Sequence, residues 1–220
     1  MKKNSVAWLL AATLIVLTPA TFAATPEDSI RPIQNEWAEI KYRLPEKQQA
    51  ERYHALADRA AQLAEKLAST PTAQAEALIW QGIAQSSEAG TKGGLGALSL
   101  AKAAKKSLEA ALKLDDSALH GSAYTSLGTL YFKVPGWPLG FGDKTRAEEL
   151  LKKALAMNPS GIDPHYFYAD YLAERDRYAE ALHHLELALK APARAGRELA
   201  DSGRRQDIHA LLAQVKKNME

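Results

Sequence analysis

The sequence predicts an all-α fold in which helical hairpins stack into a solenoid. After Ala24, apolar residues recur at steps of three and four positions and rarely alternate, which is the period of helices and not of strands. One helical segment also recurs three times along the 220-residue chain. The composition, 46% hydrophobic and 25% charged, is that of a soluble globular chain, and the absence of cysteine excludes disulfides and thiolate metal sites.

The first 23 residues have the layout of a secretory signal. Two lysines precede an apolar run from Val6 to Leu17, and small residues follow up to Ala23. A membrane span needs about 20 apolar residues, whereas this run has about a dozen. We therefore expect a signal peptide over 1–23 that is cleaved, and a periplasmic or secreted protein over 24–220. An uncleaved inner-membrane anchor is the alternative.

The charge of the remaining chain is balanced. Of the 28 lysines and arginines, two lie in the signal, so the other 26 equal the 26 acidic residues. A neutral chain lacks the basic surplus with which proteins bind nucleic acid or anionic membrane surfaces. Neither is expected as a partner.

Nine helices are expected, separated by proline, glycine and polar residues. Pro45 and Pro71 suit a first helical turn, which does not use their missing N–H, and Thr70 and Asp143 are candidate N-caps. The first two helices would cap the N-terminal end of the stack and the last helix the C-terminal end. The expected ranges are 30–43, 46–68, 72–88, 96–114, 118–133, 144–157, 164–174, 177–190 and 203–218.

The recurring segment spans 104–116, 147–159 and 181–193. The last two copies start 34 residues apart and the first two 43 apart, so the longer interval requires an insertion. Each copy places leucine between two alanines, which lets neighbouring helices approach closely around one large side chain. The aligned residues are Ala104, Leu108 and Ala111, then Ala147, Leu151 and Ala154, then Ala181, Leu185 and Ala188.

These residues resemble the tetratricopeptide repeat family, together with Leu78 and Gly82, Tyr124 and Gly128, and Tyr168 and Leu172 in the preceding helices. The resemblance covers repeats at about 75–116, 121–159 and 162–193. It implies a right-handed superhelix that binds proteins or peptides on its concave face, and it implies no cofactor.

Two long loops are expected between the helices of the first two repeats, from Glu88 to Leu95 and from Val134 to Gly142. The second loop, within LYFKVPGWPLGFGDKTRAEELLKKAL, is similar to the T component of TRAP transporters, periplasmic proteins thought to assist substrate-binding proteins. Trp137 and Phe141 either fold back to close the stack or overhang the groove and anchor a partner.

The first helix of each repeat is expected to line the concave groove. The groove lacks the Lys/Asn/Arg set with which chaperone-binding family members hold a terminal carboxylate, and the alternative is that these faces are only solvated. The expected lining is Glu76, Ile79, Ile83 and Ser86, then Ser122, Thr125, Thr129 and Lys133, then Asp163, Tyr166, Asp170 and Glu174. From these, the predicted binding residues are Ser122, Thr125, Thr129, Lys133, Tyr166 and Asp170, with Trp137 and Phe141 of the loop.

An arginine-rich segment over 194–205 follows the repeats. Glu198 and Asp201 are close enough in sequence to form structural ion pairs with its four arginines, and an anion or partner site is the alternative.

Local motifs for catalysis, nucleotides and metals are absent from the sequence. Asp143 separates Gly142 from Lys144, whereas a phosphate loop has glycine directly before lysine. The histidines lie on separate predicted helices, and adjacent His183 and His184 point about 100° apart. We therefore expect no metal, no cofactor and no catalytic residue.

The expected function is that of a noncatalytic protein- or peptide-binding adaptor in a bacterial-type cell envelope. An accessory subunit of a TRAP-type solute transporter is the first alternative. An enzyme whose site is assembled by the fold from distant residues is the second. The oligomeric state stays open.

Overall fold

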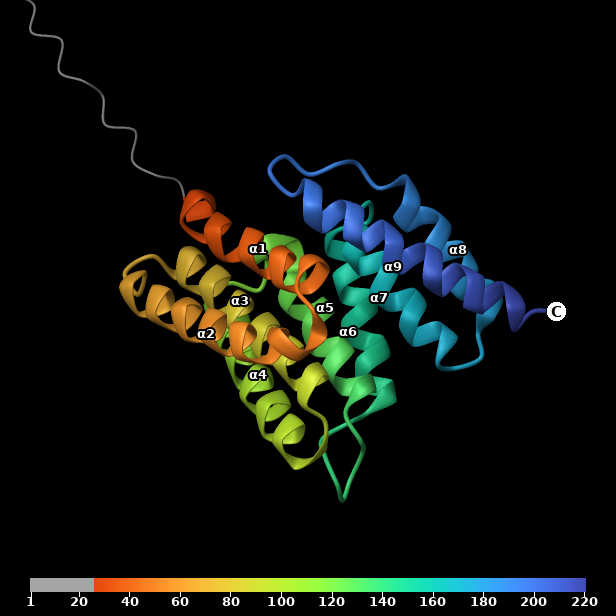
Figure 1. Ribbon diagram of the computed structural model, residues 1–220, viewed down its shortest axis with the longest axis horizontal. Coiled ribbons are helices and arrows are strands. Elements are labelled where there is room, and N and C mark those ends of the chain that lie inside the picture. Colours follow the sequence, from red (N-terminus) through yellow and green to blue (C-terminus); the bar gives the residue numbers. More distant parts are fainter. Residues whose placement is uncertain (1–25) are drawn as a thin grey trace, which may run out of the picture.

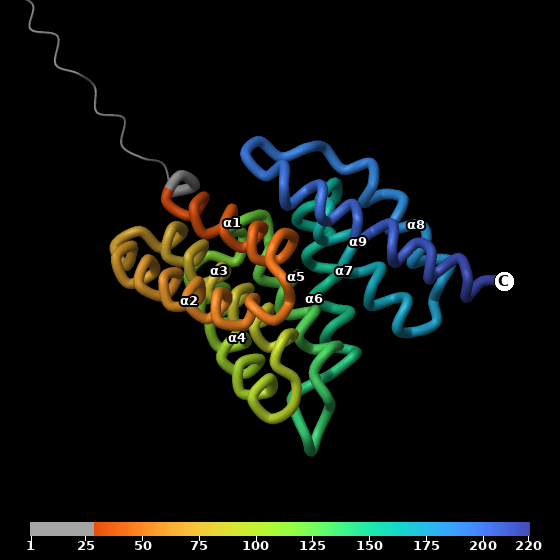
Figure 2. The backbone as a smooth tube through the Cα atoms, in the orientation of Figure 1, coloured from red at the N-terminus to blue at the C-terminus, as the bar shows by residue number. Residues whose placement is uncertain are grey.

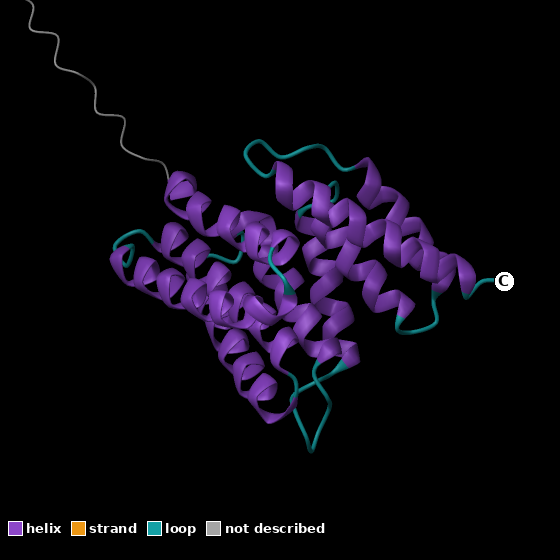
Figure 3. Ribbon diagram, viewed as in Figure 1, coloured by secondary structure: helices purple, strands orange, loops and turns teal. Residues whose placement is uncertain are grey.

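The computed structural model describes residues 26–220, in which nine α-helices and no strand are found (Figures 1 and 3). The prediction of an all-α fold is confirmed, whereas the predicted signal over 1–23 lies outside the described residues. The helices are α1 (Pro26–Arg43), α2 (Glu46–Lys66), α3 (Pro71–Lys92), α4 (Gly94–Leu114), α5 (Ala118–Lys133), α6 (Lys144–Met157), α7 (Ile162–Ala173), α8 (Tyr178–Lys190) and α9 (Glu198–Lys217).

Neighbouring helices pack as hairpins, with close contacts of α3 with α4, α5 with α6, and α7 with α8. The odd-numbered helices also contact one another in turn, from α1 through α3, α5 and α7 to α9. This row closes on itself, because α1 and α9 are in contact and lie side by side (Figure 2). The arrangement is a solenoid-like stack whose first and last helices meet.

The recurring Ala-Leu-Ala positions form the interfaces within the hairpins. Leu108 and Leu151 are fully buried against glycines of the facing helices. A Cβ atom added to Gly82 would lie 2.6 Å from Cγ of Leu108, and one added to Gly128 would lie 2.7 Å from Cγ of Leu151. Each leucine therefore occupies space that only a glycine leaves open. In the third hairpin Leu185 is equally buried, in the same apolar cluster as Ala169 of the facing helix.

The loop expected from Glu88 to Leu95 is not present, and this prediction is wrong. α3 continues to Lys92, α4 begins at Gly94, and Gly93 alone separates them. Glu88 is 1% exposed, and its carboxylate lies 2.6 Å from Nζ of Lys92 and 3.2 Å from Nδ1 of His54, which holds the last turns of α3 in place. Gly93 and Gly94 have φ angles of 65° and 61°, which let the chain reverse at once.

Helix α9 begins at Glu198, five residues before the expected start. Gly203 lies inside the helix, where an added Cβ atom would lie 2.5 Å from the ring of Tyr42 on α1. This glycine therefore permits close packing of two helices and does not start one. At α6 the expected N-cap is confirmed, because Asp143 accepts a hydrogen bond from the Arg146 backbone N–H. Thr70 precedes α3 without a capping side-chain bond.

Candidate functional site

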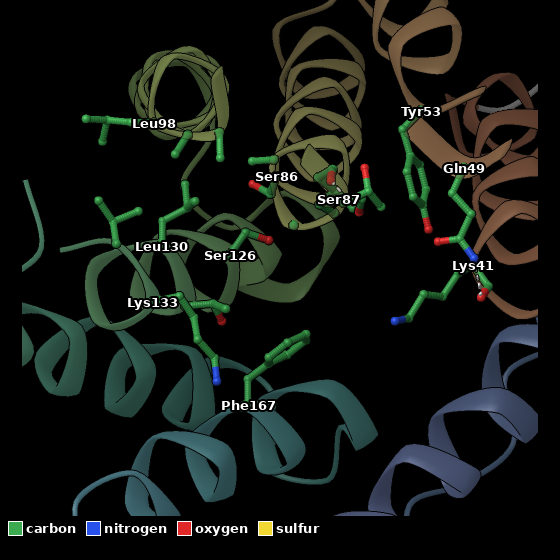
Figure 4. A pocket seen from close by; sticks show the side chains of 18 of the residues that line it. Lys41, Gln49, Tyr53, Ser86, Ser87, Leu98, Ser126, Leu130, Lys133 and Phe167 are labelled. Carbon is green, nitrogen blue, oxygen red and sulfur yellow. Dashed lines mark hydrogen bonds between the residues drawn. The ribbon is translucent and has the colours of Figure 1, made fainter. Parts of the chain in front are cut away.

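A cavity of about 1120 Å³ opens on the concave side of the stack (Figure 4). Its wall comes from α1 to α5, from the loop after α5, and from α7 and α9. Ligand sites usually have volumes of roughly 300–1000 Å³, so this cavity is large enough for a drug-sized molecule or several peptide side chains. The two helices that close the stack both contribute, α1 with Trp37 and Lys41, and α9 with Arg204 and Asp207.

One side of the cavity is apolar. Leu98 of α4 and Leu130 of α5 lie together in Figure 4, on the side away from α1 and α2. Leu95, next to the start of α4, and Leu139, in the loop after α5, extend this side and are 88% and 73% exposed. The four leucines form a surface, here called the leucine wall, in which Leu95 and Leu139 are largely exposed, Leu98 is partly buried and Leu130 belongs to the core.

The opposite side is polar and is built from α1, α2 and α3. Trp37 donates a 2.9 Å hydrogen bond from Nε1 to Oγ of Ser87, and Gln49 donates one of 2.9 Å to the Leu44 carbonyl. The Tyr53 hydroxyl is buried near Ser87, and burial raises its pKa. Lys41 points into the open space and forms no ion pair with any described residue (Figure 4).

Lys133 lies one helical turn after Leu130 on α5, on the same side of the cavity as Leu98 (Figure 4). Its Nζ is 2.9 Å from Oδ2 of Asp170 and also contacts Glu174. Burial alone would lower the pKa of Lys133, but the two carboxylates outweigh burial and raise it. Burial raises the pKa of Asp170, and Lys133 offsets this only in part. The lysine is therefore held as a cation within an ion-pair cluster.

A second ion-pair network joins α1, α7 and α9. Nε of Arg204 lies 2.8 Å from Oδ1 of Asp163, and its Nη1 lies 3.0 Å from Oδ2 of Asp207. The guanidinium carbon of Arg204 is 4.4 Å from the ring centroid of Tyr166, and the Tyr42 hydroxyl donates a 3.0 Å hydrogen bond to Asp207. Burial opposes ionisation of Asp163, but Arg204 and Arg194 hold its pKa well below the usual value.

The role of Asp163 was missed from sequence. The expected pairing of Asp201 with the arginine-rich segment is present, since Oδ1 of Asp201 lies 2.6 Å from Nη2 of Arg194. Glu198, the other expected partner, instead accepts a hydrogen bond from the Gly196 backbone N–H. The segment 194–205 contains four arginines but only two acidic residues, and this excess of arginines indicates that an acidic residue from elsewhere in the chain pairs with them.

The predicted groove residues fall into two groups. Thr129, Lys133 and Tyr166 line the cavity, as do Ile83 and Ser86. The other predicted groove residues do not line the cavity. Thr125 and Ile79 are buried in the stack, and Asp170 and Glu174 reach the cavity only through their contacts with Lys133. The remaining residues outside the wall are Ser122, Glu76 and Asp163.

The loop after α5 combines packing and exposure. Phe141 folds back against Tyr131, with ring centroids 5.5 Å apart and nearly perpendicular. Trp137 is 89% exposed and is not part of the cavity wall. Backbone hydrogen bonds from Gly142 to Pro135 and from Asp143 to Tyr131, each 2.9 Å, fix the base of the loop. The loop reaches the cavity through Leu139, which the sequence did not single out.

Two histidines that sequence reasoning treated separately are hydrogen-bonded, away from the cavity wall. Nδ1 of His165 lies 2.9 Å from Nδ1 of His184, and Nε2 of His165 lies 2.9 Å from the Pro159 carbonyl. Because a carbonyl only accepts hydrogen bonds, Nε2 of His165 carries the hydrogen and donates it to Pro159. Nδ1 of His165 is then the acceptor of the hydrogen bond that Nδ1 of His184 donates. No group of three potential metal ligands lies within residues 26–220.

Comparison with models of known protein families and with curated protein sequences finds no match for this chain. Over the part of the chain described by the structure, no helix is both long enough and apolar enough to traverse a bilayer.

Proposed function

We propose that this chain is a noncatalytic binding protein of the tetratricopeptide type that acts outside the cytoplasm and holds an apolar segment of a protein or peptide partner in its concave cavity. The leucine wall is the observation that carries the proposal. Leu95 and Leu139 stay largely exposed beside a cavity instead of joining the core. Large apolar side chains in such a position mark surfaces that bind apolar groups.

The opposite side of the cavity supplies groups for a peptide backbone. The Gln49 amide, whose N–H donates to the Leu44 carbonyl, presents its oxygen as an acceptor, and the amine of Lys41 points into the space. A segment with an apolar side chain against the leucine wall would have its polar backbone atoms opposite. Interfaces commonly combine an apolar centre with such a polar edge.

Two of the charged wall residues, Lys133 and Arg204, are better suited to binding than to catalysis. Lys133 is engaged by Asp170 and Glu174, and Arg204 by Asp163 and Asp207. A general acid or base must be able to exchange a proton with the reacting group, and groups held in ion pairs are poorly suited to this.

An accessory subunit of a TRAP-type solute transporter is a second candidate. Its support is the loop that carries the sequence resemblance, because Val134 and Leu139 of that loop are part of the cavity wall. In this case the loop would contact a solute-binding protein, or the cavity would hold the apolar part of a solute. A solute-binding protein encoded next to this chain would favour this candidate.

The test places a photocrosslinking amino acid at Leu139 in the protein spanning 24–220. The same amino acid at Leu114 is the matched control, because Leu114 is an exposed leucine at the end of α4, outside the cavity wall. We expect envelope proteins to be crosslinked from position 139 and not from position 114. With the purified partner, Leu95→Lys/Leu139→Lys should weaken binding at least about tenfold, or 1.4 kcal/mol, while Leu114→Lys leaves it unchanged.

Two results would count against the proposal. Equal crosslinking from both positions, or equal affinity of the leucine-wall and control variants, would show that the cavity is not the binding surface. If no protein is crosslinked but an apolar fluorescent probe binds the parent and not the leucine-wall variant, a small solute replaces the peptide as the expected ligand.

A further inference from the structure

The contact between Arg197 and Trp80 contains hydrogen-bond donors and no acceptor. Arg197 directly precedes α9, and its guanidinium carbon lies 5.2 Å from the ring centroid of Trp80 on α3. Trp80 is only 5% exposed. Nε of Arg197 and Nε1 of Trp80 are both buried and without a hydrogen-bond partner. Both side chains can only donate, so the contact is one acceptor short.

The two carboxylates whose charges act most strongly on Arg197, those of Asp163 and Asp201, are bound to other arginines. Asp163 accepts one hydrogen bond of 2.8 Å from Arg194 and another of 2.8 Å from Arg204. Asp201 accepts from the backbone N–H of Arg194 at 2.8 Å and from its guanidinium at 2.7 Å. Within the described part of the chain, Arg197 donates no side-chain hydrogen bond and forms no ion pair.

The electrostatic surroundings of Arg197 favour an added anion. Burial, followed by the positive charge of Arg194, lowers the pKa of Arg197 to about 10, although the charges of Asp163 and Asp201 act in the opposite direction. The guanidinium still carries its charge at neutral pH. A partly buried cation without a direct partner is costly, and an acceptor with negative charge would remove that cost.

The contact lies between α3 and the start of α9, about two helical turns from residues of the cavity wall. Arg197 precedes Arg204 by seven residues, and Trp80 precedes Ser87 by seven. Seven residues of helix advance about 10 Å and return to nearly the same face. Because Arg204 and Ser87 are cavity-wall residues, Arg197 and Trp80 lie about 10 Å beyond the cavity along α9 and α3.

We infer that Arg197 and Trp80 form an oxyanion-binding site between α3 and the start of α9, which takes a phosphate, sulfate or carboxylate group. The planar guanidinium can donate two parallel hydrogen bonds to such a group, and the indole ring fixes the plane of the guanidinium. Arg194 adds positive charge beside it. The site is distinct from the leucine wall and does not depend on the function proposed above.

The experiment titrates the protein spanning 24–220 with sodium phosphate, sulfate or acetate, with sodium chloride keeping the ionic strength constant. The NMR signal of the Arg197 Nε–H and the melting temperature are recorded. We expect a saturable change of this signal, and a rise in melting temperature of about 3 °C at ten times the dissociation constant. Phosphate or sulfate binding well above acetate identifies a tetrahedral oxyanion, and comparable acetate binding identifies a carboxylate.

Three variants test the assignment. Arg197→Gln should lose at least tenfold in affinity, and Arg197→Lys should lose less, because it keeps the charge without the planar fork. Arg175→Gln, which alters an exposed arginine, should bind like the parent. Equal shifts in chloride, or an unchanged affinity of a folded Arg197→Gln, would show adventitious ion binding and overturn the inference. So would an Arg197 signal in the parent that no anion moves, whether or not the variants fold.

Discussion

The interfaces within the hairpins and the concave face are held together by different forces. Within a hairpin, Leu108 and Leu151 fill the space left by Gly82 and Gly128, so shape and apolar burial decide the contact. On the concave face, Arg204 and Asp163 join helices that are far apart in sequence, so charge decides the contact. This stack is therefore built from local, repeated contacts and is closed by single, unrepeated ones.

The largest expected effect comes from breaking a contact within a hairpin. Leu151→Ala should lower the free energy of unfolding by about 3 kcal/mol, because Leu151 is fully buried and Gly128 cannot fill the vacated space. Urea denaturation measures the change, and Leu114→Ala at an exposed position is the control. A loss below about 1 kcal/mol would mean that the hairpin repacks and that shape does not decide its stability.

A smaller effect is expected on the concave face. Asp163→Asn should lower the free energy of unfolding by about 2 kcal/mol, because it leaves the guanidinium groups of Arg194 and Arg204 without their shared carboxylate. We place this below the usual cost for a fully buried pair because the Asp163 side chain is 30% exposed.

The exposed ion pair of Asp116 with Lys153 provides the matched comparison for this network. Asp116→Asn should change the free energy of unfolding by less than about 0.5 kcal/mol. Urea denaturation measures the free energy of unfolding of both aspartate variants. Equal decreases for the two would show that the ion-pair network around Asp163 and Arg204, which joins α7 to α9, is no stronger than an ordinary surface ion pair.

The histidine pair between α7 and α8 adds pH dependence to one hairpin. Burial, then the charges of His165 and His183, lower the pKa of His184 to about 4, and burial lowers the pKa of His165. Their ordinary value is 6.5, so protons bind more readily to the unfolded chain. Stability is complete above pH 6.5 and should fall by about 1 to 2 kcal/mol between pH 7 and pH 5.

Thermal unfolding at several pH values measures this effect. His184→Asn keeps a donor near the Nδ1 position and removes one titrating ring, so its stability should depend less on pH over the same interval. Glu148, which lies near this hairpin, has a pKa lowered to about 2 by Arg177 and stays ionised over that interval. A parent protein equally stable at pH 5 and pH 7 would contradict the prediction.

The contrast between the two regions also explains what the sequence could predict. The helices and the Ala-Leu-Ala interfaces were predictable because their signal repeats every three or four residues and again from hairpin to hairpin. The prediction of a long loop near Gly93 was wrong because a glycine-rich stretch is compatible both with a flexible loop and with a chain reversal at a single residue between two helices. The helix start near Gly203 failed for a similar reason, since glycine also permits close helix packing.

The cavity could be predicted only in part. Lys133 and Tyr166 were placed on the concave face by the repeat register and do line the cavity. Leu139 was not identified, because nothing local distinguishes a leucine that borders a cavity from one that packs below a loop. The closing network joins Tyr42 to Asp207 across 165 residues, and a single sequence carries no signal that relates two such positions.

The contact between α1 and α9 limits how this architecture can change in length. In an open solenoid a hairpin can be duplicated or lost, and the remaining units keep their neighbours. Here an additional hairpin would separate Arg31 from the Ala195 carbonyl, which it contacts at 3.2 Å, and Tyr42 from Asp207. The contact between α1 and α9 therefore fixes the number of hairpins in the stack. With that number it also fixes the size of the cavity that the hairpins enclose.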